Sequence, residues 1–221
     1  METTKLFDLS HTLAADLLHK CRYPWQALPK IKEYTEELIE KLKDDDNYYI
    51  YTDGVLVSKN TVISKNATIC APTIIGHGSE IRTGAFIRGS VIIGEGAVVG
   101  NSCEIKNSIL FDRVQVPHFN YVGDSILGYR AHTGAGVITS NVKCDRSHVT
   151  IKGERVIIET GLKKFGAMIG DLCEIGCNSV LNPGTIIGRG TTVYPLSSVR
   201  GVIPEGCVYK ADDNIVQKNV R

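Results

Sequence analysis

The sequence predicts a mainly β protein built as a parallel β-helix, and three observations predict it. An aliphatic residue recurs at every sixth position, a small residue often follows it, and the repeat is interrupted by two longer segments of different character. Neither a helical period of 3.6 nor a strand period of 2 produces such a column. Hexapeptide periodicity is typical of a parallel β-helix, in which three hexads make a coil of about 18 residues.

The aliphatic column keeps one phase over residues 57–105 and returns over residues 169–199. Its first part holds nine consecutive aliphatic residues: Val57, Ile63, Ile69, Ile75, Ile81, Ile87, Ile93, Val99 and Ile105. Its second part consists of Ile169, Ile175, Leu181, Ile187, Val193 and Val199. We expect coils to stack about 4.8 Å apart, with this column inward. Glycine often follows it, as at Gly76 and Gly94, and is expected to supply left-handed backbone at the corners.

Two segments depart from the repeat. Residues 1–50 contain SHTLAADLLHKC and PKIKEYTEELIEKLKDDD, which favour helices, with Ser10 as the expected N-cap of the first and Pro29 near the start of the second. We expect this helical appendage to cover the open first coil. Within the β-helix domain, residues 51–208, the polar stretch 141–166 is predicted to be an extruded loop, and residues 209–221 form a C-terminal tail.

Composition excludes several classes of protein. The net charge is +1 and the charged residues are spread out, so nucleic acid is not an expected partner. The chain has neither a signal-peptide pattern nor a run of about 18 apolar residues, so we expect no membrane contact and a cytoplasmic location. Seven cysteines without a CxxC pair indicate reduced thiols rather than disulfides or a metal site.

Three stretches carry a specific resemblance: AFIRGSVIIGEGAVVGNSCEIKNSIL, VPHFNYVGDSILG and TGAGVITSN. With them, residues 57–208 resemble the acetyltransferase domain of the bifunctional N-acetylglucosamine-1-phosphate uridyltransferase/glucosamine-1-phosphate acetyltransferases, which are hexapeptide-repeat acyltransferases. The resemblance implies a left-handed β-helix and a homotrimer. It also implies acetyl-CoA-dependent N-acetylation of an amino-sugar 1-phosphate, glucosamine or galactosamine 1-phosphate, for nucleotide-sugar synthesis. The glycine-rich loop of the uridyltransferase has no counterpart in residues 1–56, so nucleotidyl transfer is not expected.

His118, in QVPHFNYVGD, is the expected general base. An amine that attacks a thioester must lose a proton, and histidine, with an unperturbed pKa near ~6.5, suits that task. The resemblance assigns this role to the histidine of the motif. A surface or packing histidine is the alternative interpretation.

Arg88, Lys106 and Tyr121 are the expected phosphate ligands. Arg88 and Lys106 are one full coil apart in the sequence, so they should stack on one edge and converge on one phosphate. The resemblance assigns phosphate binding to both, and places Tyr121 facing the phosphate. A solvated side chain at a coil corner is the alternative for each.

Further roles come from the resemblance. Asn141, expected beside His118 as a catalytic residue, matches an asparagine that hydrogen-bonds the sugar near the reacting nitrogen; a turn residue before a long loop is the alternative. Ala135 matches an alanine whose backbone contacts acyl-CoA, and a glycine-rich corner without a ligand is the alternative. Cys177, in place of a family serine, and Pro195 complete the expected acetyl-CoA site. His132, expected to bind the substrate, replaces an asparagine that contacts the sugar, and Val142 replaces a tyrosine beside the substrate, so the acceptor sugar stays open.

Three alternatives accompany this hypothesis. Cys103, Cys144 or Cys177 could act as a nucleophile, although such cysteines usually pack as small apolar groups. A γ-type carbonic anhydrase would hold its metal with three histidines, and His77, His118 and His132 are candidates whose spacing does not fit. A non-catalytic module that binds a sugar nucleotide or assembles a nucleotidyltransferase is the third.

Overall fold

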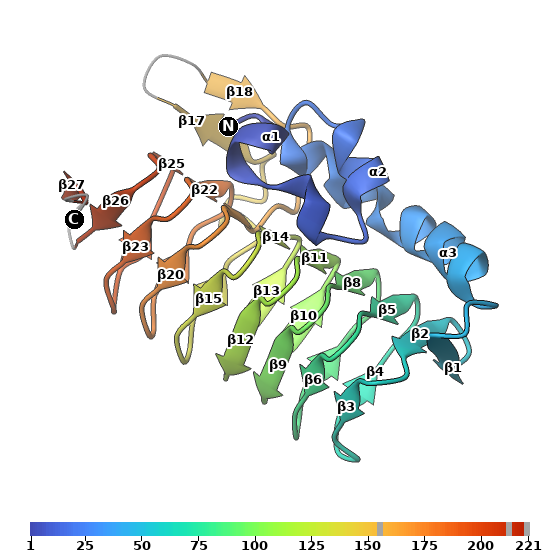
Figure 1. Cartoon of the computed structure of the whole chain (residues 1–221). Helices are drawn as coiled ribbons and strands as arrows, with labels where there is room; N and C mark the ends of the chain where they lie inside the picture. Colours follow the sequence, from blue (N-terminus) through green and yellow to red (C-terminus); the bar gives the residue numbers. More distant parts are fainter. Residues whose placement is uncertain (154–156, 211–213, 219–221) are drawn as a thin grey trace.

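The computed structural model describes residues 1–153, 157–210 and 214–218. The chain winds into a solenoid of short parallel strands, with helices along one side and a hairpin projecting from it (Figure 1). The predicted fold class, a mainly β parallel β-helix with an N-terminal helical segment, is confirmed. Successive coils place their strands in three sheets, here called sheets 1, 2 and 3 in the order in which the chain meets them.

Sheet 1 has nine strands, β1 (Tyr48–Thr52), β2 (Val55–Ser58), β5 (Thr73–Ile75), β8 (Val91–Ile93), β11 (Ser108–Leu110), β14 (Ile126–Leu127), β19 (Ala167–Ile169), β22 (Thr185–Ile187) and β25 (Val202–Ile203). Sheet 2 has nine, β3 (Val62–Ile63), β6 (Glu80–Ile81), β9 (Val98–Asn101), β12 (Gln115–His118), β15 (His132–Thr133), β20 (Glu174–Ile175), β23 (Thr192–Val193), β26 (Cys207–Tyr209) and β27 (Ile215–Gln217). Sheet 3 has seven, β4 (Thr68–Ile69), β7 (Phe86–Ile87), β10 (Glu104–Lys106), β13 (Tyr121–Gly123), β16 (Ile138–Thr139), β21 (Val180–Leu181) and β24 (Ser198–Val199). The first, second and third corners follow sheets 1, 2 and 3 respectively.

The strand register explains why the phase of the repeat is lost after residue 105. Ile87 pairs with Ile105, which is a full step of three hexads, but Ile105 pairs with Val122, a step that is one residue shorter. The next coil is shortened in the same way, since Leu110 pairs with Leu127. Each of these two coils therefore omits one residue, but the inward column continues through them. Its members there are all buried: Leu110, Val116, Val122, Leu127, Thr133 and Thr139.

The glycines that follow the column serve a different purpose from the one predicted. Gly76 and Gly94 do not have positive φ; a Cβ on Gly76 would lie 2.7 Å from the carbonyl carbon of Gly94. Side chains at these positions would therefore prevent the coils from stacking. The left-handed residues lie two positions further along the chain, at Gly78 and Gly96, for example.

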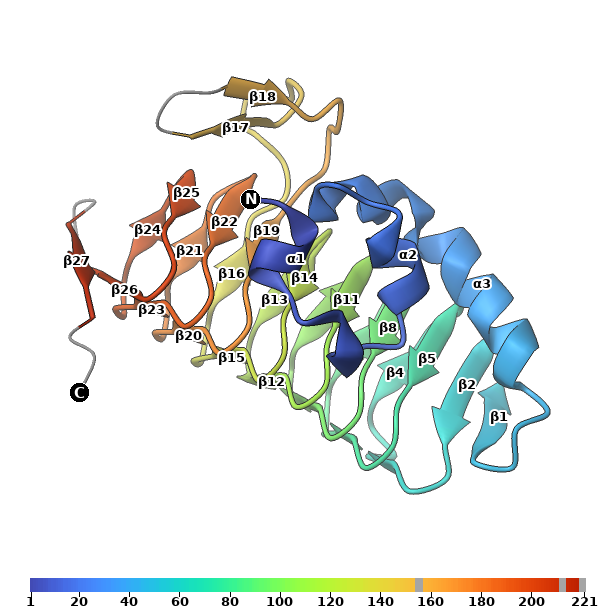
Figure 2. The ribbon, with the colours of Figure 1, turned by 45° about the horizontal axis from the view of Figure 1, so that its top comes forward.

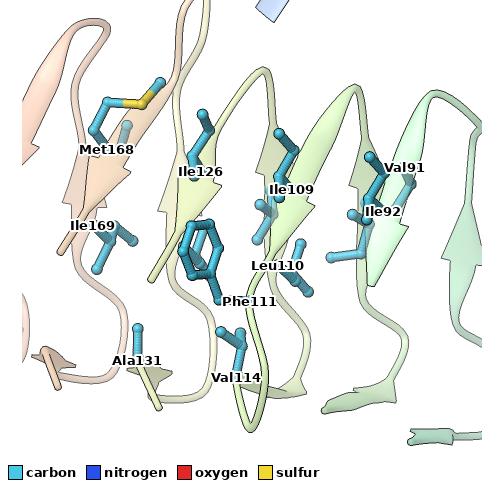
Figure 3. Close-up of a cluster of buried hydrophobic side chains, with 14 of the residues drawn as sticks. Val91, Ile92, Ile109, Leu110, Phe111, Val114, Ile126, Ala131, Met168 and Ile169 are labelled. Carbon is cyan, nitrogen blue, oxygen red and sulfur yellow. The ribbon is translucent and has the colours of Figure 1, made fainter. Parts of the chain in front are cut away.

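Sheet 1 is apolar on both of its faces, which sheets 2 and 3 are not. A second buried column runs along its outer side: Leu56, Ile74, Ile92, Ile109, Ile126, Met168 and Ile186. Ile109 and Leu110, and likewise Met168 and Ile169, point to opposite sides of their strands (Figure 3). Because both faces must be buried, this sheet needs a covering layer.

The N-terminal helical segment supplies that layer, so the predicted cap over the first coil is wrong. It lies along the outside of sheet 1 (Figure 2), while β1 pairs antiparallel with β2 at the edge of the first coil. Its elements are α1 (Thr3–Leu6), η1 (Leu9–His11), α2 (Ala15–His19), η2 (Pro24–Lys30) and α3 (Ile31–Leu42). Phe7 packs on Phe111, with ring centroids 5.1 Å apart.

The local details of this segment differ in part from the prediction. Helix α3 buries Ile31, Thr35, Leu38 and Ile39, the one-sided spacing of an amphipathic helix, and it begins two residues after Pro29. Ser10 is not an N-cap: it lies within η1, where Asp8 is the cap and accepts the Ser10 N–H. In the described part of the chain, no helix is both long enough and apolar enough to cross a membrane.

The extruded loop leaves the solenoid after β16 and returns at β19. It carries a hairpin of β17 (Thr150–Lys152) and β18 (Ile157–Glu159), which the sequence did not reveal. Residues 154–156 of the predicted loop lie outside the described residues, as do residues 211–213 and 219–221 of the predicted tail. Tyr209, the first residue of that tail, belongs to β26, with which β27 pairs antiparallel.

Candidate active site

His118 ends β12 at the second corner, and its side chain is exposed. Its carbonyl accepts the Gly136 N–H at 3.0 Å, the Ala135 carbonyl accepts the Asn178 N–H at 2.8 Å, and the Cys177 carbonyl accepts the Leu196 N–H at 2.9 Å. His118, Ala135, Cys177 and Pro195 therefore stack on one corner, one in each successive coil. Strand spacing makes this row about 14 Å long from end to end.

Asn120 fixes the backbone that carries His118. Its buried side chain accepts the His118 N–H at 3.1 Å and donates to the Gly134 carbonyl, in the next coil, at 2.7 Å. Phe119, between these two residues, is left-handed with φ 52°. The corner is thus set by a buried amide, whereas the His118 imidazole has no hydrogen-bond partner among the described residues and stays free to meet a ligand.

A second group of side chains gathers at the third corner around the buried carboxylate of Asp124. Lys106 Nζ donates to both carboxylate oxygens, at 3.0 and 3.1 Å. Asn107 Nδ2 donates to Oδ1 at 2.8 Å, and Asn141 Nδ2 donates to Oδ2. Asn141 Nδ2 also donates to the Tyr121 hydroxyl at 3.2 Å. Lys106, Tyr121 and Asn141, each expected in the site, are thus brought together by a residue that the sequence analysis did not single out.

Arg88 stacks beneath Lys106, as its spacing predicted. Phe86 pairs with Glu104 and Ile87 with Ile105, and the Arg88 N–H donates to the Ile105 carbonyl at 2.8 Å. The guanidinium is not free, because Arg88 NH1 donates to Glu104 Oε1 at 2.6 Å. Arg88 and Lys106, the two cationic residues among the expected phosphate ligands, therefore each have a carboxylate partner in this structure.

Tyr121 is suited to donate a hydrogen bond. Burial, and then the negative charges of Asp124 and Glu104, raise the pKa of the Tyr121 phenol, so it stays neutral near pH 7. Since Asn141 donates to its oxygen, the phenolic hydrogen is available for an anionic ligand.

His132 does not join this group. It lies on β15 in sheet 2, in register with Gln115 and Glu174, and its Nδ1 is 2.7 Å from Glu174 Oε2. It lines a hollow at the first corner together with Arg113 and Arg130. Within one chain the structure therefore separates His132 from the cluster around Asp124. Val142 is exposed at the start of the extruded loop.

The structure offers little to the metal and cysteine alternatives. Among residues 1–153, 157–210 and 214–218, no three His, Cys, Asp or Glu side chains could hold a metal ion together. His77 Nδ1 lies 3.5 Å from Asn60 Nδ2, and His77 lines a different hollow from His132. The three histidines therefore do not form a set of metal ligands. Burial raises the pKa of the Cys103 thiol, which makes it a poor nucleophile, whereas Cys144 and Cys177 are exposed.

The residues that sequence reasoning missed are Asp124, Asn120, Asn107 and Glu104. Asn107, Asp124 and Asn141 follow one another along the third corner at equal intervals, each one residue short of three hexads. A search of the sequence at this shorter interval would have found the row of Asn107, Asp124 and Asn141. The interval of three full hexads, which aligns Arg88 with Lys106, does not find it.

The chain was compared with known proteins. The family described as the GMPPB C-terminal domain matches residues 69–164, a range that contains His118 and the Asp124 cluster. The bifunctional protein GlmU of Methanococcus maripaludis is 33% identical over 200 residues, which cover 89% of this chain and 48% of that protein. A bifunctional sugar-1-phosphate nucleotidylyltransferase/acetyltransferase of Sulfurisphaera tokodaii is 34% identical over 109 residues, which cover 48% of this chain and 27% of that protein.

Solved structures resemble the chain more distantly. The acetyltransferase domain of PglB from Neisseria gonorrhoeae, in complex with acetyl coenzyme A, is 15% identical with a TM-score of 0.27, covering 82% of this chain and 64% of that one. So distant a likeness carries no argument about the site. The resemblance predicted from the sequence is confirmed by the relatives at 33% and 34% identity, and the chain spans about half the length of the first of them.

Proposed function

We propose that this chain, a homologue of the bifunctional GlmU proteins, transfers an acetyl group from acetyl-CoA to the amine of an amino-sugar 1-phosphate. The observation that carries this proposal is that His118 begins the second-corner row and is followed closely in the chain by the Asp124 cluster. Its own corner continues along Ala135, Cys177 and Pro195, and three residues after it the chain enters the Asp124 cluster at Tyr121. The candidate base thus belongs to a row suited to a thioester and adjoins, along the chain, a cluster suited to a phosphate.

His118 acts as the general base in this mechanism. The acceptor amine, as its free base, attacks the thioester carbonyl carbon, and His118 accepts the nitrogen proton as the new C–N bond forms. The C–S bond then breaks, CoA leaves as a thiolate, and the imidazolium returns the proton to its sulfur. Direct attack requires no covalent enzyme intermediate, in keeping with the burial of Cys103.

Arg88, Lys106 and Tyr121 hold the phosphate. An arginine has five N–H donors and a lysine three, so each retains donors after pairing with Glu104 or Asp124. The Tyr121 hydroxyl adds a neutral donor. Asn141 is fixed by Asp124 and Tyr121 at the edge of this cluster, where its side-chain oxygen Oδ1 is left to meet the sugar.

Acetyl-CoA lies along the second corner in this proposal. Ala135 and the neighbouring glycines Gly134 and Gly136 leave the backbone accessible, and Cys177 and Pro195 extend the row. A homotrimer and a cytoplasmic location remain predictions, and sedimentation equilibrium measures the former. Because the matched family description names a domain and no activity, a non-catalytic sugar-nucleotide module remains the alternative.

Thiol release from acetyl-CoA tests the proposal, with glucosamine 1-phosphate and galactosamine 1-phosphate offered separately. His118→Ala should lower kcat by about 10²–10⁴-fold, the usual contribution of a general base. His19→Ala, a change at an exposed histidine of α2, is the control and should leave turnover unchanged. Normal turnover in His118→Ala overturns the mechanism, and no thiol release by folded wild-type protein with either sugar favours the non-catalytic module.

A further inference from the structure

The N-terminal helical segment contacts the Asp124 cluster through Asn107. The Asn107 amide nitrogen has two hydrogens and two acceptors: Asp124 Oδ1 at 2.8 Å, and the carbonyl of Leu28, in η2, at 3.3 Å. Asn107 is left-handed with φ 45°, so its side chain leaves the third corner in a direction that an ordinary strand residue would not give it. One amide thus ties the helical segment to the buried carboxylate that holds Lys106 and Asn141.

A second contact reaches the same cluster through the extruded loop. Trp25, in η2, lies against Phe165 with ring centroids 5.9 Å apart, and both rings are buried. The Phe165 N–H donates to the Asn141 carbonyl at 2.9 Å, and the Gly166 N–H donates to the Asp124 carbonyl at 2.8 Å. The ring that Trp25 covers therefore belongs to the segment whose backbone holds Asn141 and Asp124 in place.

We propose that η2 is a positioning element of the acceptor site, acting through Asn107 on Asp124 and through Phe165 on Asn141. The inference rests on the proposed function for its consequence, acceptor binding, but the contacts are independent of it. Asn141 begins the extruded loop, and no further strand is formed before Thr150. Contacts from outside the loop are needed to fix such a residue, and η2 supplies them.

A different result is expected if the N-terminal helical segment only covers sheet 1. The segment buries the outer face of sheet 1 and is attached to it elsewhere, since the Asp8 N–H donates to Asp171 Oδ2 at 2.7 Å and Phe7 packs on Phe111. If covering were its whole role, loss of the Asn107 contacts would lower stability and leave acceptor affinity unchanged. Positioning predicts that acceptor affinity falls while catalysis by His118 persists.

Asn107→Gly tests the inference, because glycine accepts the left-handed backbone and removes both hydrogen bonds. Ser90→Gly is the matched control: Ser90 is left-handed at the same corner one coil earlier, with φ 54°, and its side chain makes no hydrogen bond in the described residues. We expect Asn107→Gly to raise KM for the phosphorylated acceptor about 5- to 20-fold, the effect of one or two lost hydrogen bonds, with KM for acetyl-CoA and kcat near wild type. An unchanged acceptor KM, or an equal rise in Ser90→Gly, overturns the inference.

Amide hydrogen exchange decides the same question without turnover. The Phe165 and Gly166 amides should exchange at least 10-fold faster in Asn107→Gly than in wild type or Ser90→Gly, while amides of the strands in sheet 2 stay protected. Unchanged exchange at both amides overturns the inference whether or not the protein is an enzyme. If wild-type protein releases no thiol, the proposed function fails, and this comparison still stands.

Two further measurements sharpen the test. Asn107→Asp keeps a residue that tolerates the left-handed backbone, but it faces the Asp124 carboxylate with a second carboxylate, so KM for the acceptor should rise by more than in Asn107→Gly.

Trp25 is the sole tryptophan, so its fluorescence emission reports on η2 directly. Saturating glucosamine 1-phosphate should change Trp25 emission in wild type and much less in Asn107→Gly. Equal changes in the two proteins count against the coupling.

Discussion

Lys106 and Asp124 form an ion pair at 3.0 Å in which the carboxylate is 4% exposed and the lysine 23% exposed. The buried partner is therefore the acid, and it also accepts hydrogen bonds from Asn107 and Asn141. The negative charge is held in place by three donors, and the lysine reaches toward solvent from it. Asp124 thus orients the cluster, and under the proposed function a phosphate would meet Lys106 rather than Asp124.

Asp124→Asn should weaken acceptor binding and lower stability together. An asparagine has one acceptor oxygen, so its own amide group would face Asn107, Asn141 or Lys106 as a second donor. We expect acceptor KM to rise about 10-fold and the free energy of unfolding to fall by about 2 kcal/mol. Asp171→Asn is the control for stability, since Asp171 is equally buried and pairs with Arg189 away from the cluster. Equal acceptor KM values for the two variants would contradict the role given to Asp124.

Glu104→Gln should tighten acceptor binding. Glu104 Oε1 lies 2.6 Å from Arg88 Nη1, so its negative charge opposes the approach of a phosphate to the donors that the guanidinium retains. Removing that charge should lower KM for the phosphorylated sugar about 2- to 5-fold, with a smaller effect at high salt. Glu80→Gln breaks a similar exposed pair with Arg82 and should leave KM unchanged. A raised KM in Glu104→Gln would mean that Glu104 positions Arg88 rather than opposing the phosphate.

Arg88→Ala should raise KM for the phosphorylated sugar about 10-fold with little loss of kcat, because it removes a proposed phosphate ligand and leaves the proposed base, His118, in place. Activity on the sugar without its phosphate should not change. Arg82→Ala serves as the control, since Arg82 is also paired with a glutamate but lies in sequence between β6 and β7. Equal activity of wild type on phosphorylated and unphosphorylated sugars would remove the basis for assigning Arg88 and Lys106.

Stability should fall at alkaline pH, in part because of Cys173. Burial raises the pKa of its thiol from 9.0 to about 12. Because the folded-state pKa exceeds the unfolded value, the folded state keeps a proton that the unfolded state has lost, so stability declines as pH rises from about 9 toward 12. Urea unfolding across that range should show a shallower decline in Cys173→Ala. Cys144→Ala, at an exposed position, should follow wild type, and parallel curves for all three proteins would contradict this account.

The fold could be predicted from the sequence because the solenoid repeats its chemistry. One inward residue per strand produced a column that stays in phase from Val57 to Ile105, and no other architecture gives that pattern. The two shortened coils could not be seen by a search for a fixed period. The outer column of sheet 1, from Leu56 to Ile186, was present in the sequence as adjacent aliphatic pairs such as Ile74 and Ile75. Had it been read as a second buried face, it would have predicted helices along the side of the solenoid.

The sequence predicted the candidate-site residues that belong to a motif, but not the side-chain contacts that form between coils. The stacking of Arg88 on Lys106 followed from coil length alone. The carboxylate between Lys106 and Asn141, and the pairing of His132 with Glu174, depend on which side chains meet across coils of unequal length. Such contacts can be predicted only when the strand register between coils is known, and the sequence repeat does not indicate that register in this region.

The two short coils also set limits on how this protein can change by insertion and deletion. A single residue gained or lost between Lys106 and Asn141 would shift the Asn107–Asp124–Asn141 row out of alignment, whereas substitutions leave the alignment intact. Between residues 57 and 87, where the register step is uniform, an entire coil could be duplicated or removed with every inward residue still meeting its neighbour. The first half of the chain can therefore be lengthened only by whole coils, with a helical segment long enough to cover the added part of sheet 1, and the residue count must stay fixed around the Asp124 cluster.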